Sequence, residues 1–173
     1  LLEGRLLAVE AQGRHRYYRL RDPAVSAALE SLMVLTAARP EPPRALSPAE
    51  RALREARMCY DHLAGALGVR LTRAMTERGL LAHEDGELRL TESGERQLQD
   101  FGIDLAALRR RRRAFVRGCL DWSERQIHLA GAVGAALTQR LLDLRWLRRA
   151  HSGRALVVTE AGRRGLRSVF RVS

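Results

Sequence analysis

The sequence predicts a mainly α fold with small β-hairpins, an α+β arrangement in which one helix-and-hairpin unit occurs twice in tandem. Two observations carry this prediction. LAGALG at 63–68 recurs as LAGAVG at 129–134, and the similarity continues to the Thr-Glu pairs that begin at Thr91 and Thr159. The spacing rises from 66 to 68 residues inside a predicted hairpin, where a loop tip absorbs extra length at little cost. We therefore expect two copies of one supersecondary unit.

The elements of the first copy follow from its local chemistry. Small residues at 62–67 predict a short helix, and 69–78 predicts a second helix that Gly79 ends. An Asp-Gly pair between leucines predicts a two-stranded hairpin, and Thr91 predicts the cap of a further helix. Helix, turn, helix, hairpin and helix form the order of a winged helix-turn-helix. The expected fold is two tandem winged-helix-like repeats after a partial amino-terminal one.

Composition indicates a cytoplasmic protein with a polyanionic partner. The 173 residues are 46% hydrophobic and carry a net charge of +11, which favours nucleic acid as a partner. The sequence contains no apolar run long enough to span a membrane, and it does not open with an export signal. No membrane partner is therefore predicted. Two cysteines far apart make no disulfide framework.

The first part of the chain carries a family resemblance. Alternating residues on either side of Gln12-Gly13 predict a hairpin. GRLLAVEAQGRHRYYRL, followed by DPAVSAALESLMVL, closely resembles the wing and carboxy-terminal helix of ArsR-type winged-helix repressors. CYDHLAG, DWSER and HLAGAVGAALTQRLL resemble a long-chain bacterial subgroup of that family, so the resemblance covers nearly the whole chain. It implies that the family's first helices, including the DNA-reading one, precede Leu1.

The resemblance implies double-stranded DNA as the partner, contacted by the wing. The hairpin tip combines cations with amphipathic rings, which suit contacts with the phosphate backbone. The candidate DNA-binding residues there are Arg14, His15, Arg16, Tyr17 and Tyr18. In the first repeat, Arg70 and Arg73 are further candidates, whereas the equivalent helix of the second repeat is too apolar for a groove helix. The alternative is a solvated hairpin with a tyrosine facing the core.

An apolar stripe follows the hairpin on a predicted helix. Its candidate dimer-interface residues are Val25, Leu29, Leu32 and Met33. The resemblance implies a homodimer at this place, which suits a two-fold symmetric operator. Packing against the stripe's own domain is the alternative.

The expected domains follow from composition. They are a wing and dimerisation helix at 1–38, a proline-rich linker at 39–47, repeat 1 at 48–103 and repeat 2 at 104–173. Ser47 and Glu50 predict a capping box, and the helix that it starts is expected to run past Cys59 toward Tyr60. Five arginines at 109–113 are expected on a helix, where solvation and pairing with acids are favoured over the alternative of phosphate binding.

Two clusters contain residues that bind metals or titrate. One is Cys59, Asp61 and His62, and the other is Cys119, Asp121, Glu124 and His128. Cysteine, histidine and carboxylate are ligands for zinc-like ions, and the cysteines are also open to oxidation. Cys59, His62 and Cys119 are therefore sensing candidates. Because the sequence has neither a CxxC nor an HxxxH pattern, no metal ligand set is assigned. The alternative is that the cysteines are buried as small apolar side chains.

These observations favour a DNA-binding transcriptional regulator of ArsR type, a repressor released by an unknown signal. Scattered histidines, without a nucleophile elbow or a phosphate-binding glycine loop, argue against an enzyme. Trp122 and Trp146 are expected to anchor packing. One alternative is a winged-helix module that docks another protein without reading DNA. Another is a metal or redox sensor that uses Cys59 and Cys119.

Overall fold

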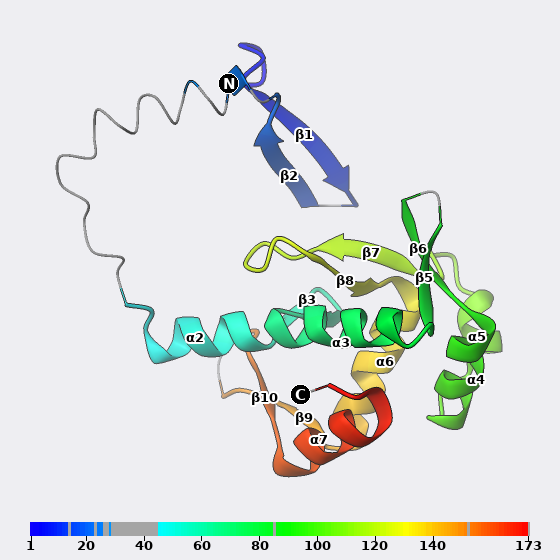
Figure 1. Cartoon of the computed structure of the whole chain (residues 1–173). Helices are drawn as coiled ribbons and strands as arrows, with labels where there is room; N and C mark the ends of the chain where they lie inside the picture. Colours follow the sequence, from blue (N-terminus) through cyan, green and yellow to red (C-terminus); the bar gives the residue numbers. More distant parts are fainter. Residues whose placement is uncertain are drawn as a thin grey trace. The chain divides into compact units, whose positions relative to one another are not determined.

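The computed structural model divides the chain into two compact units, Leu1–Ala45 and Leu46–Ser173 (Figure 1). The described residues are 1–13, 15–22, 24, 25, 28, 45–84, 86–151 and 153–172. None of the helices within these ranges is long and apolar enough to cross a membrane.

The first unit contains the predicted hairpin. β1 (Leu7–Gln12) pairs antiparallel with β2 (His15–Leu20), and Gly13 in the turn has a φ of 59°, which favours glycine. Val9 and Tyr18 lie opposite each other and are 44% and 51% exposed. The prediction of a hairpin here is confirmed, and one of its faces presents apolar side chains.

The second unit contains the repeat. Its first copy is β3 (Arg57–Cys59), β4 (His62–Ala64), α3 (Ala66–Glu77), β5 (Leu81–Glu84), β6 (Glu87–Leu90) and α4 (Glu92–Asp100). Its second copy is β7 (Arg117–Leu120), β8 (Ile127–Ala130), α6 (Gly131–Asp143), β9 (Leu147–Arg149), β10 (Leu156–Val158) and α7 (Glu160–Gly165), continued by the π-helical turn η1 (Leu166–Phe170). α2 (Pro48–Glu55) precedes the first copy and α5 (Leu105–Arg109) links the two. Both copies therefore run hairpin, helix, hairpin, helix, so the same order of elements occurs twice in this unit (Figure 1).

The predicted short helix at 62–67 is wrong, because His62–Ala64 is strand β4 and α3 begins at Ala66. Gly65 stands between them with a φ of 84°, and a Cβ there would lie 2.5 Å from the carbonyl oxygen of Arg54. A helix cannot continue through that conformation. The first helix of the expected helix-turn-helix pair is thus a strand, and the repeat begins with a hairpin.

Two other helix predictions were too long. The helix capped by Ser47 and Glu50 has the expected capping box but ends at Glu55, after which the chain turns into β3. The arginine run is helical only as far as Arg109, which ends α5. The hairpin at β5–β6 and the Thr91 cap of α4 are confirmed.

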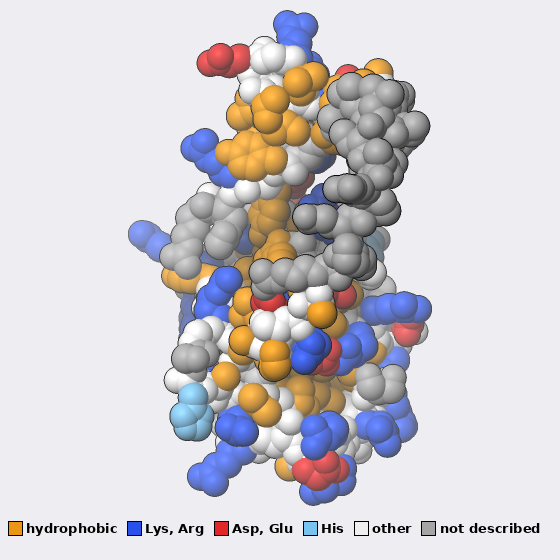
Figure 2. Space-filling view, turned by 90° about the vertical axis from the view of Figure 1, so that its left-hand side faces the viewer, with side chains coloured by type: hydrophobic (Ala, Val, Ile, Leu, Met, Phe, Trp, Pro, Cys, Tyr) orange, Lys and Arg blue, Asp and Glu red, His pale blue; other side chains and the backbone are white. Residues whose placement is uncertain are grey.

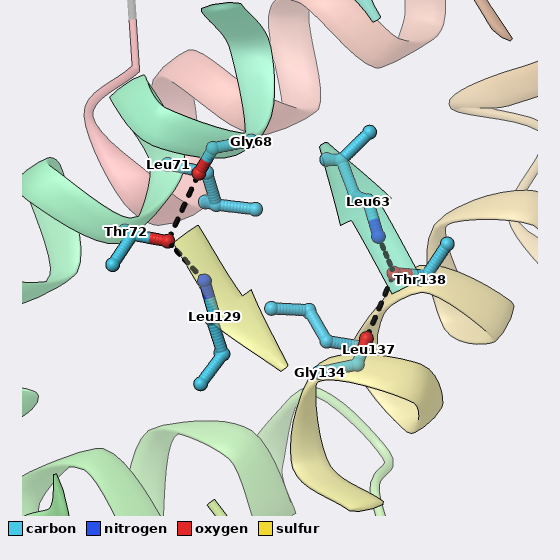
Figure 3. A pocket seen from close by; sticks show the side chains of 8 residues that line it. All are labelled: Leu63, Gly68, Leu71, Thr72, Leu129, Gly134, Leu137 and Thr138. Carbon is cyan, nitrogen blue, oxygen red and sulfur yellow. Dashed lines mark hydrogen bonds between the residues drawn. The ribbon is translucent and has the colours of Figure 1, made fainter. Parts of the chain in front are cut away.

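The two copies interlock about their central helices, since α3 packs against β8 and α6 packs against β4. The Leu63 amide donates to Thr138 Oγ1 and the Leu129 amide to Thr72 Oγ1, each over 2.8 Å. Figure 3 shows these two reciprocal hydrogen bonds on opposite sides of a small cavity of about 10 Å³. Because each bond joins one copy to the other, the repeats form one body related by a local pseudo-two-fold axis.

Leucines from both copies fill the core of the second unit, together with Phe170. Trp146 is half-buried and its ring lies 5.3 Å from that of Phe101, so its predicted packing role is confirmed. Trp122 is 48% exposed, and the Arg57 guanidinium lies 4.5 Å from its ring centre. Trp122 therefore covers a buried arginine instead of filling the core.

Candidate functional site

Four side chains of the types that can bind metals meet where the two copies interlock. Cys59 lies opposite His62 on the β3–β4 hairpin, and Cys119 lies opposite His128 on the β7–β8 hairpin. Directly opposed residues of an antiparallel pair project from the same face of the sheet. The two sulfurs and one ring nitrogen of each histidine lie within 4.8 Å of one another. Each copy thus contributes one cysteine and one histidine to a single cluster, which we call the Cys2His2 cluster.

The Cys2His2 cluster is enclosed by protein. His62, Cys119 and His128 are 4%, 2% and 1% exposed, and Cys59 is half-buried. The backbone positions of these residues are fixed by the interlock, because Leu63 and Leu129 follow the two histidines directly and donate to the threonines of the opposite copy. The cluster is therefore built on rigid strands.

The two imidazoles face each other. His62 Nε2 lies 3.2 Å from His128 Nε2, and the ring centres are 5.1 Å apart. The opposite nitrogens face carboxylates, since His62 Nδ1 lies 3.3 Å from Asp61 Oδ1 and His128 Nδ1 lies 3.3 Å from Asp121 Oδ2. A carboxylate beside Nδ1 favours the tautomer that carries its proton there, which leaves Nε2 with a lone pair.

Arginine side chains form ion pairs with both of these aspartates. Arg57 Nη2 lies 2.6 Å from Asp121 Oδ1 in a buried pair, and Arg113 Nη1 lies 2.6 Å from Asp61 Oδ2 nearer the surface. The Gly65 amide also donates to Asp121 Oδ2 over 2.7 Å. Each histidine thus has beside its Nδ1 an aspartate that is itself held in place.

These contacts shift the titration of the buried groups. Burial alone would raise the pKa of Asp121, but contact with His128 and hydrogen bonds from the Gly65 amide and Arg57 hold that pKa well below its ordinary range. Burial alone would lower the pKa of His128, but Asp121 and Cys119 together raise it. Asp121 is therefore a carboxylate at neutral pH.

The two thiols also influence each other. The hydrogen bond between them raises the pKa of Cys59 and lowers that of Cys119, whose thiolate is further favoured by the neighbouring His128 and His62. The cluster thus offers a thiolate, a second sulfur and two imidazole nitrogens. This donor set is the one that tetrahedral zinc-type sites use.

The structure joins two clusters that the sequence presents separately. The sensing candidates Cys59, His62 and Cys119 come together, and His128 joins them. Glu124 does not belong to the group and instead accepts a hydrogen bond from Ser123. One sequence signal relates the histidines, because His62 and His128 are 66 residues apart and occupy the same place in the repeat.

The candidate DNA-binding residues lie in both units. On β2, Arg16 and Tyr18 are exposed, and Tyr17 is half-buried. His15 begins β2, and Arg14 lies outside the described residues. On α3, Arg70 Nη2 lies 2.7 Å from Glu55 Oε1 and Arg73 Nε lies 2.7 Å from Glu77 Oε1. The α3 arginines are therefore already paired with carboxylates.

Only part of the candidate dimer stripe can be located. Val25 is half-buried and its amide donates to Asp22 Oδ1 over 3.2 Å, as in a helix cap. Leu29, Leu32 and Met33 lie outside the described residues.

Two arginines of the 109–113 run form ion pairs, as expected for a solvated, salt-bridged segment. Arg109 pairs with Glu95, and Arg113 pairs with Asp61 beside the Cys2His2 cluster. The intervening arginines are exposed. On the face drawn in Figure 2, basic side chains are dispersed over the larger unit.

Comparison with known proteins identifies the class. The chain is 41% identical over 163 residues to a bacterial protein, and the match covers 94% of this chain and 72% of that protein. The chain belongs to the HTH-type transcriptional regulators. The relative is YdfF of Bacillus subtilis strain 168, described as an uncharacterized HTH-type transcriptional regulator. No family model and no solved structure matches the chain.

Proposed function

We propose that this transcriptional regulator is of ArsR type and binds double-stranded DNA as a homodimer, with the β1–β2 hairpin as its wing. The observation that carries the proposal is this hairpin, which joins exposed arginines to an exposed tyrosine in a chain of net charge +11. Cations at a wing contact phosphates, and a tyrosine ring packs against the sugar backbone. The proposed partner is duplex DNA carrying a two-fold symmetric operator.

The apolar face of the hairpin supports its assignment as a wing. On this face, Val9, Tyr18 and Leu20 are each between 38% and 51% exposed, and Figure 2 shows apolar side chains gathered over this hairpin. A lone two-stranded hairpin is marginal in water and needs a helix against one face. In a winged helix, the DNA-reading domain supplies that cover.

The paired repeats serve a separate purpose in this proposal. The first repeat's candidate arginines form ion pairs with Glu55 and Glu77, so they are less available to bind phosphates. The α6 helix of the second repeat is apolar on much of its surface. We assign the interlocked repeats to the regulatory half of a repressor, which an effector acts on to release DNA.

The experiment is binding of the full-length protein to a fragment of its own promoter, followed by fluorescence anisotropy. The proposal predicts tight binding to this fragment, at two chains per site, and weak binding to a scrambled fragment of equal length. Equal affinity for the two fragments would reject sequence-specific regulation through direct DNA contact.

A second candidate function is a docking module that binds another protein. The exposed apolar residues Val9, Tyr18 and Leu20 favour it, because such a face also suits a protein partner. Salt separates the candidates. Phosphate contacts weaken steeply as salt rises, whereas apolar docking does not.

A further inference from the structure

We propose that Cys59, His62, Cys119 and His128 bind one divalent metal ion of zinc type in a closed tetrahedral site. The Cys2His2 cluster draws one cysteine and one histidine from each repeat, so the ion would cross-link the two copies at their pseudo-two-fold axis. This inference goes beyond regulation of transcription, because it concerns what the interlocked repeats bind.

The distances fit such an ion. Two nitrogens at zinc's usual bond length lie about 3.3 Å apart when the geometry is tetrahedral, and two thiolate sulfurs lie about 3.8 Å apart. His62 Nε2 and His128 Nε2 are 3.2 Å apart, and all four ligand atoms lie within 4.8 Å of one another. A contraction of at most about 1.3 Å in the longest separation closes the set.

The orientation of the imidazoles gives an independent argument. Asp61 and Asp121 each lie 3.3 Å from Nδ1 of a histidine. The two Nε2 atoms face each other across 3.2 Å, so one cation placed between them can accept a lone pair from both nitrogens. Carboxylate, histidine and metal in line form the usual outer arrangement of zinc sites.

The charges around the cluster also balance. Asp61 and Asp121 are neutralised by Arg113 and Arg57 respectively, so they add no net charge. Two thiolates then match a divalent cation, and the buried complex is neutral. A neutral complex avoids the desolvation cost that a lone buried cation or thiolate pair incurs.

The completeness of the ligand set defines the site's role. Four protein ligands fill a tetrahedral shell, and structural zinc sites are closed in this way, whereas catalytic ones keep a position for water. Because unfolding disperses a preformed set of this kind, metal binding stabilises the folded repeats. The ion would therefore hold the regulatory half together.

The first test is metal content, measured by mass spectrometry on the purified full-length protein after extended dialysis without chelator. We expect one zinc ion per chain. X-ray absorption at the zinc edge should report two sulfur neighbours at about 2.3 Å and two nitrogen neighbours at about 2.0 Å. Metal at trace level, even after incubation with excess zinc under reducing conditions, would overturn the proposal.

Cobalt substitution tests the ligands individually. The wild-type protein loaded with Co²⁺ should give the strong visible bands of a tetrahedral thiolate complex, and Cys119→Ser and His62→Gln should lose them. The exposed His83 provides the matched control, because His83→Gln should keep the bands unchanged. Equal spectra in all four proteins would contradict the assigned site.

The positioning aspartates provide a variant less prone to unfolding. Asp61 is only partly buried, so Asp61→Asn should keep the fold, checked by circular dichroism, while weakening Co²⁺ affinity about 10- to 100-fold. Asp143→Asn, which alters an exposed aspartate, should leave the affinity unchanged. Unaltered affinity in Asp61→Asn would reject its positioning role.

Oxidation is the competing chemistry of the same sulfurs. The proposal predicts that zinc protects both thiols from a mild disulfide-forming oxidant, measured by thiol titration. Rapid formation of a Cys59–Cys119 disulfide in protein incubated with equimolar zinc would assign the pair to redox chemistry instead. These readouts need no DNA, so they can fail independently of the proposed function.

Discussion

Thr72 and Thr138 show how single side chains hold the repeats together. Each hydroxyl donates to a carbonyl four residues earlier in its own helix, at Gly68 and Gly134, and accepts from an amide of the other copy. Both threonines are buried, so water cannot replace the missing partner of an amide. A hydroxyl at these two positions therefore fixes the register between the copies.

Replacement of either threonine by valine should be costly. Thr138→Val leaves the Leu63 amide unsatisfied and should lower the free energy of unfolding by about 1–3 kcal/mol, and Thr72→Val should cost a similar amount. Urea unfolding measures both. Thr76→Val is the control, because its hydroxyl donates to Thr72 O within the same helix. A loss in Thr76→Val as large as in Thr138→Val would contradict this explanation.

At the same scale, the sequence indicated which residue types could bind a metal, but it did not predict that these four residues meet in one cluster. Cys59 and Cys119 are 60 residues apart, whereas the histidines are 66 apart, because the β7–β8 turn is longer than the β3–β4 turn. This difference hid the equivalence of the two Cys–His pairs. Their meeting depends on the pseudo-two-fold packing of the repeats, which no local spacing encodes.

At the scale of elements, the second half of each repeat was predictable and the first half was not. A β-turn signal and threonine caps act locally, so β5–β6, α4 and α7 match their predictions. The segment 62–67 has helix-favouring leucine and alanine, yet His62–Ala64 is a strand. Its strand form is stabilised by pairing with β3 and by contact with α6, both of which are tertiary.

Gly65 is the local residue that makes this switch from strand to helix. Gly65→Ala meets two penalties, a φ of 84° and a Cβ 2.5 Å from the Arg54 carbonyl oxygen. Gly86→Ala is the matched control, since its φ is 78° but nothing lies within 4 Å of its Cβ. We expect Gly65→Ala to lower the free energy of unfolding by about 1–3 kcal/mol more than the control. Equal losses in urea unfolding would show that the close approach at Gly65 carries no cost.

At the scale of the whole molecule, the class of protein and the fold of its larger unit rest on different observations. The 41% identity to an HTH-type regulator establishes the class of protein, and the duplicated unit explains how residues 46–173 fold. The proposed DNA contact lies in the hairpin of the other unit. DNA binding and metal binding are therefore expected to be separable by mutation.

The separation gives clear expectations for arginine variants. Arg14 and Arg16 belong by sequence to the proposed wing, and their joint replacement by alanine should weaken DNA binding. It should also reduce the slope of log affinity against log salt by about 2, or about 1 for each phosphate that an arginine no longer neutralises. Arg89→Ala is the control. It removes an exposed arginine from another hairpin, where Glu84 and Glu87 already pair with it.

The most direct test is this salt slope, measured on the promoter fragment with the full-length wild-type protein, the Arg14→Ala/Arg16→Ala double variant and Arg89→Ala. The account predicts a steep slope for the wild type, a shallower one for the wing variant and an unchanged one for Arg89→Ala. Binding that is independent of salt, or a slope that the wing variant leaves unchanged, would contradict DNA contact through the β1–β2 hairpin.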